Sequence, residues 1–117
     1  MQEEMKRRTK RIGLEVIKLL DELSNKLSAR AIGNQIIRSS TSIGANYHAA
    51  CRAKSTADFV NKLKIVEEEA DETIYWLEML VESGLVLKER TASLLSETNE
   101  VLSIIVASIN TTKNKMK

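Results

Sequence analysis

The side chains best suited to chemistry in this sequence are one histidine, one cysteine and a run of acids. His48 and Cys51 are three residues apart, so on a helix they would share a face and could touch. Nucleophilic catalysis also needs a group that orients the base, and no such third group is evident near this pair. A small buried thiol beside an exposed histidine is therefore the preferred interpretation.

The acidic run Glu67-Glu68-Glu69-Ala70-Asp71-Glu72 is the other candidate for chemistry. A di-iron bundle needs Glu-x-x-His pairs on facing helices, but Ala45 stands three residues before the single histidine. One histidine and one cysteine are too few for the usual zinc ligand set, and no Gly-rich phosphate loop is present. We therefore expect no catalytic residues, no metal and no cofactor, and we predict that the protein is not an enzyme.

Helices must position these residues, because the composition leaves few alternatives. The 117 residues include no proline and only four glycines, the main helix breakers. No repeat or Gly/Ser/Pro-rich linker divides the chain, which predicts one domain over residues 1–117. Apolar residues recur at three- and four-residue steps and predict helices at about 8–24, 29–53, 56–83 and 88–112.

Short connections between these helices predict an all-α, antiparallel up-down-up-down four-helix bundle. Ser55 followed by Asp58 is typical of a capping box at the start of the third helix. Gly84 is suited to a left-handed residue that ends this helix, and Ser28 is suited to cap the second helix.

This topology brings the start of the first and third helices and the end of the second and fourth to one end of the bundle. Twelve basic residues fall there against Glu3, Glu4 and Asp58, a net charge of +9, whereas the remainder has six basic and thirteen acidic residues, a net charge of −7. A dense basic surface suits phosphate backbones, although lysine-rich chain ends are also often only solvated. The predicted nucleic-acid-binding residues are Lys6, Arg7, Arg8, Lys10, Arg11, Arg52, Lys54, Lys62 and Lys64. With Lys113, Lys115 and Lys117 they form what we call the basic pole.

Small and hydroxylated residues occupy the stretch from Arg38 to Asn46, where a helix core would normally carry larger apolar side chains. We predict that Asn46 is buried and fixes helix register. Antiparallel pairing of the second and third helices predicts a semi-buried Arg38 bonded to Glu69 or Glu72.

Several large apolar residues fall outside the core stripes of the third helix and the turn after it. They predict an oligomer interface, because such side chains are costly to leave in water. These residues are Val60, Tyr75, Trp76 and Met79, together with Val86.

The start of the chain has no apolar run like that of a signal peptide, and no stretch approaches the roughly 20 apolar residues of a membrane span. The single cysteine cannot form an internal disulfide. We therefore expect a cytoplasmic protein with no membrane partner.

The run Gln35-Ile36-Ile37-Arg38-Ser39-Ser40-Thr41-Ser42-Ile43-Gly44-Ala45-Asn46, then Arg52, Phe59 and Trp76-Leu77-Glu78, resembles the four-helix bundle family of 23S ribosomal RNA intervening-sequence proteins. The resemblance spans nearly the whole chain. Many members continue Ile-Ala-Glu-Gly after the asparagine, whereas Tyr47-His48-Ala49-Ala50-Cys51 follows here. Any role of that glutamate is therefore not transferred to this chain.

The resemblance implies a homo-oligomer, a pentameric ring of bundles. It also implies a relation to the accessory proteins of diversity-generating retroelements, in which a positively charged pentamer is thought to engage nucleic acid and the polymerase. Together with the basic pole, this predicts a non-enzymatic oligomer that binds RNA or DNA backbone. The alternative is a protein–protein scaffold or adaptor with no nucleic-acid role.

Overall fold

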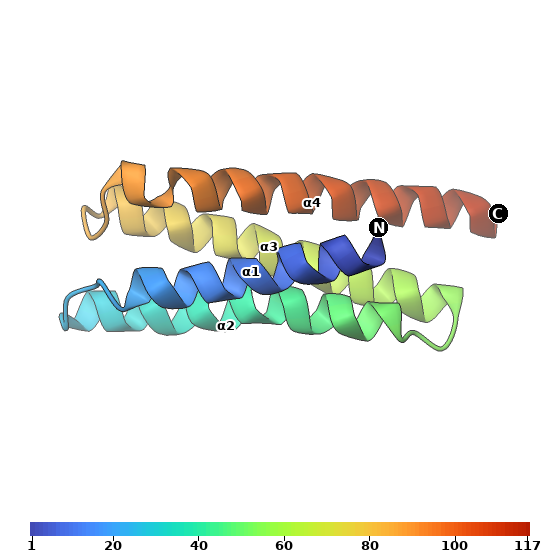
Figure 1. The fold of residues 1–117 in the computed structure, drawn as a ribbon, viewed down its shortest axis with the longest axis horizontal. Helices are drawn as coiled ribbons and strands as arrows, with labels where there is room; N and C mark the ends of the chain where they lie inside the picture. The colour runs from blue at the N-terminus through green and yellow to red at the C-terminus, as the bar shows by residue number, and fades with distance from the viewer.

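The computed structural model describes residues 1–117 as four long helices and no strands: α1 (Gln2–Leu20), α2 (Leu27–Cys51), α3 (Thr56–Glu82) and α4 (Lys88–Met116). The helices alternate in direction, and each packs against its neighbours in the order α1, α2, α3, α4 and back to α1. The result is an elongated bundle of 49 × 21 × 21 Å (Figure 1). The predicted all-α, up-down-up-down four-helix bundle is confirmed.

Two helices are longer than the sequence predicted. α1 begins at Gln2 rather than near residue 8, because Met5 and Thr9 continue its buried stripe through the charged segment. Glu3 and Glu4 in its first turn also favour an early start, since acids stabilise the positive end of the helix dipole. α4 runs past residue 112 to Met116, so it covers the start of α3 more fully than expected.

The ends of α3 follow the predicted local chemistry. The Asp58 backbone N–H donates to the Ser55 hydroxyl at 3.0 Å, and the Asp58 carboxylate accepts from the Lys54 N–H at 3.1 Å. Gly84 takes the left-handed conformation with φ of 83°. The prediction for Ser28 is wrong, because α2 begins one residue before it, with Lys26 at the cap position and no side-chain cap.

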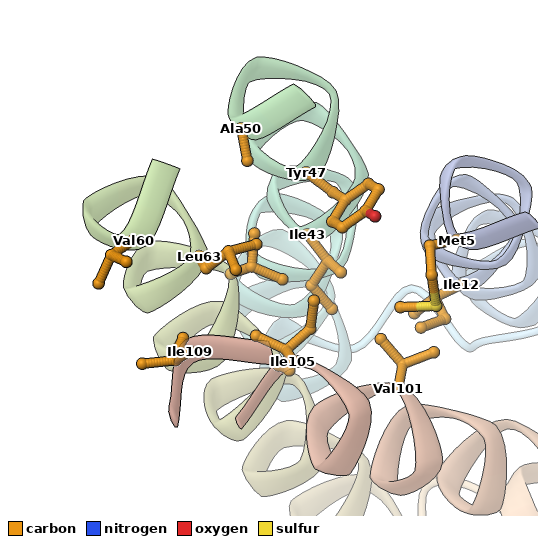
Figure 2. Packing of buried hydrophobic residues seen from close by; sticks show 12 residues of the cluster. Met5, Ile12, Ile43, Tyr47, Ala50, Val60, Leu63, Val101, Ile105 and Ile109 are labelled. Atoms are coloured by element: carbon orange, nitrogen blue, oxygen red, sulfur yellow. The ribbon is translucent and has the colours of Figure 1, made fainter. Parts of the chain in front are cut away.

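The core is divided into two apolar clusters along the bundle. The larger cluster, near the basic pole, draws side chains from all four helices, including Met5, Ile43, Leu63 and Ile105 (Figure 2). The smaller cluster lies near the opposite end and includes Val16, Leu77 and Val86. Buried hydroxyls lie between the two, and the Thr73 hydroxyl donates to that of Ser39 at 2.9 Å.

Glycine permits a close approach of α1 to α2. A Cβ atom at Gly44 would lie 3.1 Å from the Lys10 Cα atom, and one at Gly13 would lie 3.3 Å from the Thr41 Cα atom. These two contacts set the register of the pair, with Lys10 opposite Gly44 and Gly13 opposite Thr41.

α4 is long and apolar enough, by length and composition, to cross a membrane. Core helices of bundles meet the same criterion. Here Val101, Ile105 and Ile109 are buried against the other helices, and Glu97 and Glu100 pair with α1.

Candidate nucleic-acid interface

Part of the basic pole lies at one end of the molecule. The turn between α2 and α3 and the end of α4 are found there, with α4 projecting beyond the other helices, whereas α1 begins short of that end (Figure 1). Arg8 bonds Glu97 in the first half of α4, and Lys10 lies against Gly44 of α2. The expected position of the α1 cations is therefore wrong, because they lie nearer the middle of the bundle than the other cations of the pole.

Arg8 does not belong to the free cations of this surface. Its guanidinium donates twice to Glu97 of α4, at 2.9 and 2.7 Å, and Glu100 lies at 3.1 Å. Hydrogen bonding to Glu97 raises the pKa of Arg8, and burial opposes that rise. The assignment of Arg8 to phosphate binding is therefore corrected. Arg8 links α1 to α4 through a bidentate ion pair, which is stronger than a pair with a single hydrogen bond.

Three other cations of the pole have carboxylate neighbours on their own helix. Lys6 lies 3.2 Å from Glu3, Lys62 lies 2.8 Å from Asp58, and Arg11 lies 3.9 Å from Glu15. Such exposed pairs within one helix are weak and exchange readily for another anion. These three residues remain available to a phosphate.

The other basic-pole residues have no carboxylate oxygen within 4.0 Å. The Lys64 side chain, reaching from α3, lowers the pKa of Lys113 on α4, first by hydrogen bonding and then by the repulsion between the two ammonium groups. A phosphate between them would relieve this repulsion. The unpaired residues are Arg7, Lys10, Arg52, Lys54, Lys64, Lys113, Lys115 and Lys117.

Arg38 forms the predicted pairs with α3. Its guanidinium donates to Glu69 at 3.1 Å and also bonds Glu72, which in turn accepts from the Trp76 indole N–H at 3.1 Å. The Arg38 bond, followed by the Trp76 bond, lowers the pKa of Glu72. The expected semi-burial is wrong: Arg38 is exposed and lies over the seam between α2 and α3.

Asn46 does not have its expected role. It is only half-buried, and its amide donates to the carbonyl and hydroxyl of Ser42, both at 2.9 Å and both on its own helix. An amide that bonds within one helix cannot fix the register of two. The buried Ser39–Thr73 bond joins α2 to α3 instead.

No hydrogen bond joins the candidate catalytic pair, His48 and Cys51. Cys51 is half-buried and not fully buried as expected, and burial, followed by the neighbouring Cys51 thiol, raises the pKa of Tyr47 to about 12. His48 is exposed on the surface of α2. No group of three or more His, Cys, Asp or Glu side chains is placed to hold a metal ion.

Of the predicted interface residues, Tyr75 and Met79 are exposed on α3. Trp76 is half-buried, and its ring meets Tyr75 edge-to-face with centroids 5.0 Å apart. The assignments of Val60 and Val86 are wrong, because both are buried in the core clusters. Val60 shares its cluster with Ile109, which lies in the C-terminal part of α4, and Figure 2 shows the two side chains near each other.

The polar seam between α1 and α4 was not predicted from the sequence. A groove of about 770 Å³ runs along it, and Arg8 with Glu97 and Arg90 with Glu22 bridge it. Because α1 and α4 are not consecutive, no turn sets their register. The oppositely charged residues on the two helices were the only available signal.

The carboxylates in these pairs make stability depend on pH in a defined direction. Arg8 lowers the pKa of Glu97, and Arg38 lowers that of Glu72, each from an ordinary value of 4.5. A carboxyl group with a depressed folded pKa stabilises the fold fully above its unfolded pKa and loses that contribution as pH falls through the folded value. We expect the Tm to be steady from pH 7 to about 5 and to fall below about 4.5. Thermal melts across this pH range test the prediction. Glu97→Gln should make the fall of the Tm at acid pH less steep. A Tm that rises on acidification would contradict the stabilising role of these ion pairs.

The fold and the site together define a class of protein: an antiparallel four-helix bundle whose buried and seam polar groups pair with one another, and whose α2–α3 turn and end of α4 bring unpaired cations together. The chain belongs to the family described as 23S rRNA-intervening sequence protein, which matches residues 2–107.

A solved structure supports the same assignment. The chain is similar to a protein of unknown function from the S23 ribosomal protein family of Bacteroides thetaiotaomicron VPI-5482, with 34% identity and a TM-score of 0.86. The alignment covers 93% of this chain and 97% of that one. No curated protein matches the sequence.

Proposed function

We propose that this protein is a non-enzymatic, self-associating bundle that binds the backbone of RNA or DNA through its basic pole. The observation that carries the proposal is the set of unpaired cations at the α2–α3 turn, at the start of α3 and at the end of α4, with Arg7 and Lys10 of α1 set back toward the middle of the bundle. Phosphate backbones are recognised by such clusters, and each neutralised phosphate releases counterions.

Backbone contact is favoured over base recognition. The chain has one Phe, one Trp and two Tyr. Phe59 is packed against the core, and Tyr47 is buried within it. Trp76 and Tyr75 lie toward the other end of α3. Stacking on single-stranded bases requires aromatic faces beside the cations, and the basic pole offers only the partly buried Phe59.

Self-association would strengthen this binding. The exposed Tyr75 and Met79, with half-buried Trp76 beside them, supply apolar area that a second copy could cover. A ring, pentameric as the family resemblance implies, would place several basic poles on one phosphate chain, and linked sites bind far more tightly than single ones. Light scattering on the purified protein measures the number of subunits.

The experiment for nucleic-acid binding neutralises three unpaired cations of the pole, Arg7, Arg52 and Lys54, by substitution with Gln. We expect the affinity for a duplex DNA or structured RNA at low salt to fall about tenfold, because phosphate contacts are lost. The slope of log K against log salt concentration should become shallower by up to about 0.9 for each contact removed.

The matched control removes three cations from the opposite end, Lys26, Arg30 and Lys88, which also lack carboxylate partners. Its net charge changes equally, so a general charge effect would weaken both variants alike. Equal loss in the two variants, or no binding by the unaltered protein at low salt, would refute the proposal.

A protein–protein scaffold is the second candidate. An apolar groove of about 480 Å³ between α3 and α4, lined by Leu77, Val81, Ala92 and Leu95 among others, favours it. A scaffold that uses this groove should be indifferent to neutralisation of the basic pole.

A further inference from the structure

α3 carries an exposed ridge that is both apolar and acidic. Ile65, Glu68, Tyr75 and Met79 recur at spacings that place them on one outward face of the helix. Tyr75 is 52% exposed, Ile65 is 41% exposed and Met79 is 37% exposed. No cation lies within 4.0 Å of Glu68. We call these four residues the α3 ridge.

A second exposed surface, at the outer seam of α1 and α2, is both apolar and basic. Leu14 and Ile17 of α1 are 49% and 39% exposed, and Ile37 of α2 is 37% exposed. The contacts of Gly13 with Thr41 and of Gly44 with Lys10 set an antiparallel register that places Ile17 opposite Ile37. Lys10, unpaired, borders the apolar patch on the side of the basic pole. Lys10, Leu14, Ile17, Ile37 and Thr41 form what we call the α1–α2 face.

The two surfaces match in height along the bundle axis. The bond between the Ser39 and Thr73 hydroxyls places these residues at one level, and Ile37 and Tyr75 are each two residues from it toward the same end of the bundle. Tyr75 is therefore level with Ile37 and with Ile17 opposite it. Glu68, nearer the basic pole, is likewise close to the level of Lys10. The aromatic residue of the α3 ridge is thus level with the aliphatic residues of the α1–α2 face, and its acidic residue is close to the level of the basic one.

We propose that the α3 ridge of one copy docks on the α1–α2 face of a second copy, with the two bundle axes parallel. The assignment rests on the self-association included in the proposed function, and it names the surfaces and their orientation. Tyr75 would cover Ile17 and Ile37, while Glu68 would pair with Lys10. Complementary charges of this kind select one register and reject the reversed one.

Such a contact joins two different surfaces, so it is heterologous and repeats from copy to copy. α3 has no direct packing with α1, since each packs only with α2 and α4, so the two helices occupy diagonal corners. α1 therefore occupies the corner diagonally opposite α3, and the α1–α2 face lies beside α1 on the side toward α2. Successive copies would therefore turn in a constant sense, as ring closure requires, and all basic poles would face the same way.

Cross-linking tests the assignment in the full chain with Cys51→Ala as background. The variant that combines Ile17→Cys with Tyr75→Cys, treated with a short bis-maleimide, should give a ladder of covalent dimers, trimers and larger species. Each single cysteine should give at least about tenfold less dimer, because a heterologous contact never brings like residues together. The matched control combines Tyr75→Cys with Ser96→Cys on α4, outside both surfaces, and should give no ladder.

Charge reversal supplies an independent readout by light scattering over a dilution series. Lys10→Glu and Glu68→Lys should each raise the dissociation constant of self-association by about tenfold, and the double reversal should restore it to within about threefold. An oligomer without the ladder, a ladder in the control or dimers from a single cysteine would overturn the assignment while self-association stands. A protein that stays monomeric at all concentrations would overturn both the assigned contact and the proposed self-association. The nucleic-acid test has a separate readout, and two of its three residues, Arg52 and Lys54, lie away from the two surfaces, whereas Arg7 lines the same hollow as Leu14 and Ile17.

Discussion

Replacing Gly44 with leucine should force α1 away from α2 and lower the free energy of unfolding by about 3 kcal/mol. A Cβ atom at this position would lie 3.1 Å from the Cα and 3.2 Å from the N of Lys10, and 3.3 Å from the carbonyl carbon of Thr9. All three are backbone atoms of α1, so no side-chain rotation relieves the overlap. Urea denaturation followed by circular dichroism measures the loss.

Alanine at Gly44 and at Gly33 provides the matched comparison within the same helix. A Cβ atom at Gly33 would meet only the Leu20 side chain, at an ordinary 3.5 Å. Gly33→Ala should therefore stabilise the protein by about 0.5–1 kcal/mol through helix propensity. Gly44→Ala should destabilise it. Equal effects at the two positions would show that the α1–α2 contact adapts and that glycine is not required there.

The helices were predictable from the sequence because periodic apolar residues and the lack of proline act locally. The start of α1 was not, because only Met5 and Thr9 mark its core face among the charged residues that begin the chain. A single apolar residue per turn is too weak a pattern to distinguish a helix from a solvated terminus. In the folded protein, Met5 is buried in the larger core cluster, and this burial stabilises the first turns of α1.

Polar contacts were predictable only where a tight turn sets the register. α2 and α3 are joined by a short turn, so the level of Arg38 on α3 could be counted, and its bonds to Glu69 and Glu72 are present. The contact of Arg8 with Glu97 joins the first and last helices, for which no such count exists. The sequence therefore predicted a basic pole and could not distinguish its structural arginine from its free ones.

The exposed apolar surface was predictable in part. Tyr75 and Met79 face outward, as their positions on the helical wheel require. Val60 does not, because it is buried in the larger core cluster, to which Ile109 of α4 also belongs. Whether a residue at the edge of a core stripe is covered depends on how the neighbouring helix packs across it, and the spacing of residues along one helix does not show this.

Truncation of Leu63 to alanine should lower the free energy of unfolding by about 2–5 kcal/mol, the usual cost of a cavity in a well-packed core. Leu63 is fully buried in the larger cluster, among side chains from all four helices (Figure 2). Leu27→Ala is the control, because Leu27 is largely exposed and surface changes usually stay within about 0.5 kcal/mol. Equal losses in the two variants would contradict the assigned core.

Leu63 also separates stability from binding, because Lys62 and Lys64 flank it on the surface of α3. Attraction to a phosphate backbone depends on the number and approximate position of cations and tolerates small shifts of each. Below its Tm, the Leu63→Ala variant should therefore bind duplex DNA with an affinity within about threefold of the unaltered protein and with an unchanged salt slope. If binding were lost while the helices remained folded, phosphate recognition would require a rigid constellation of cations, and a defined RNA or DNA shape would become the better candidate ligand.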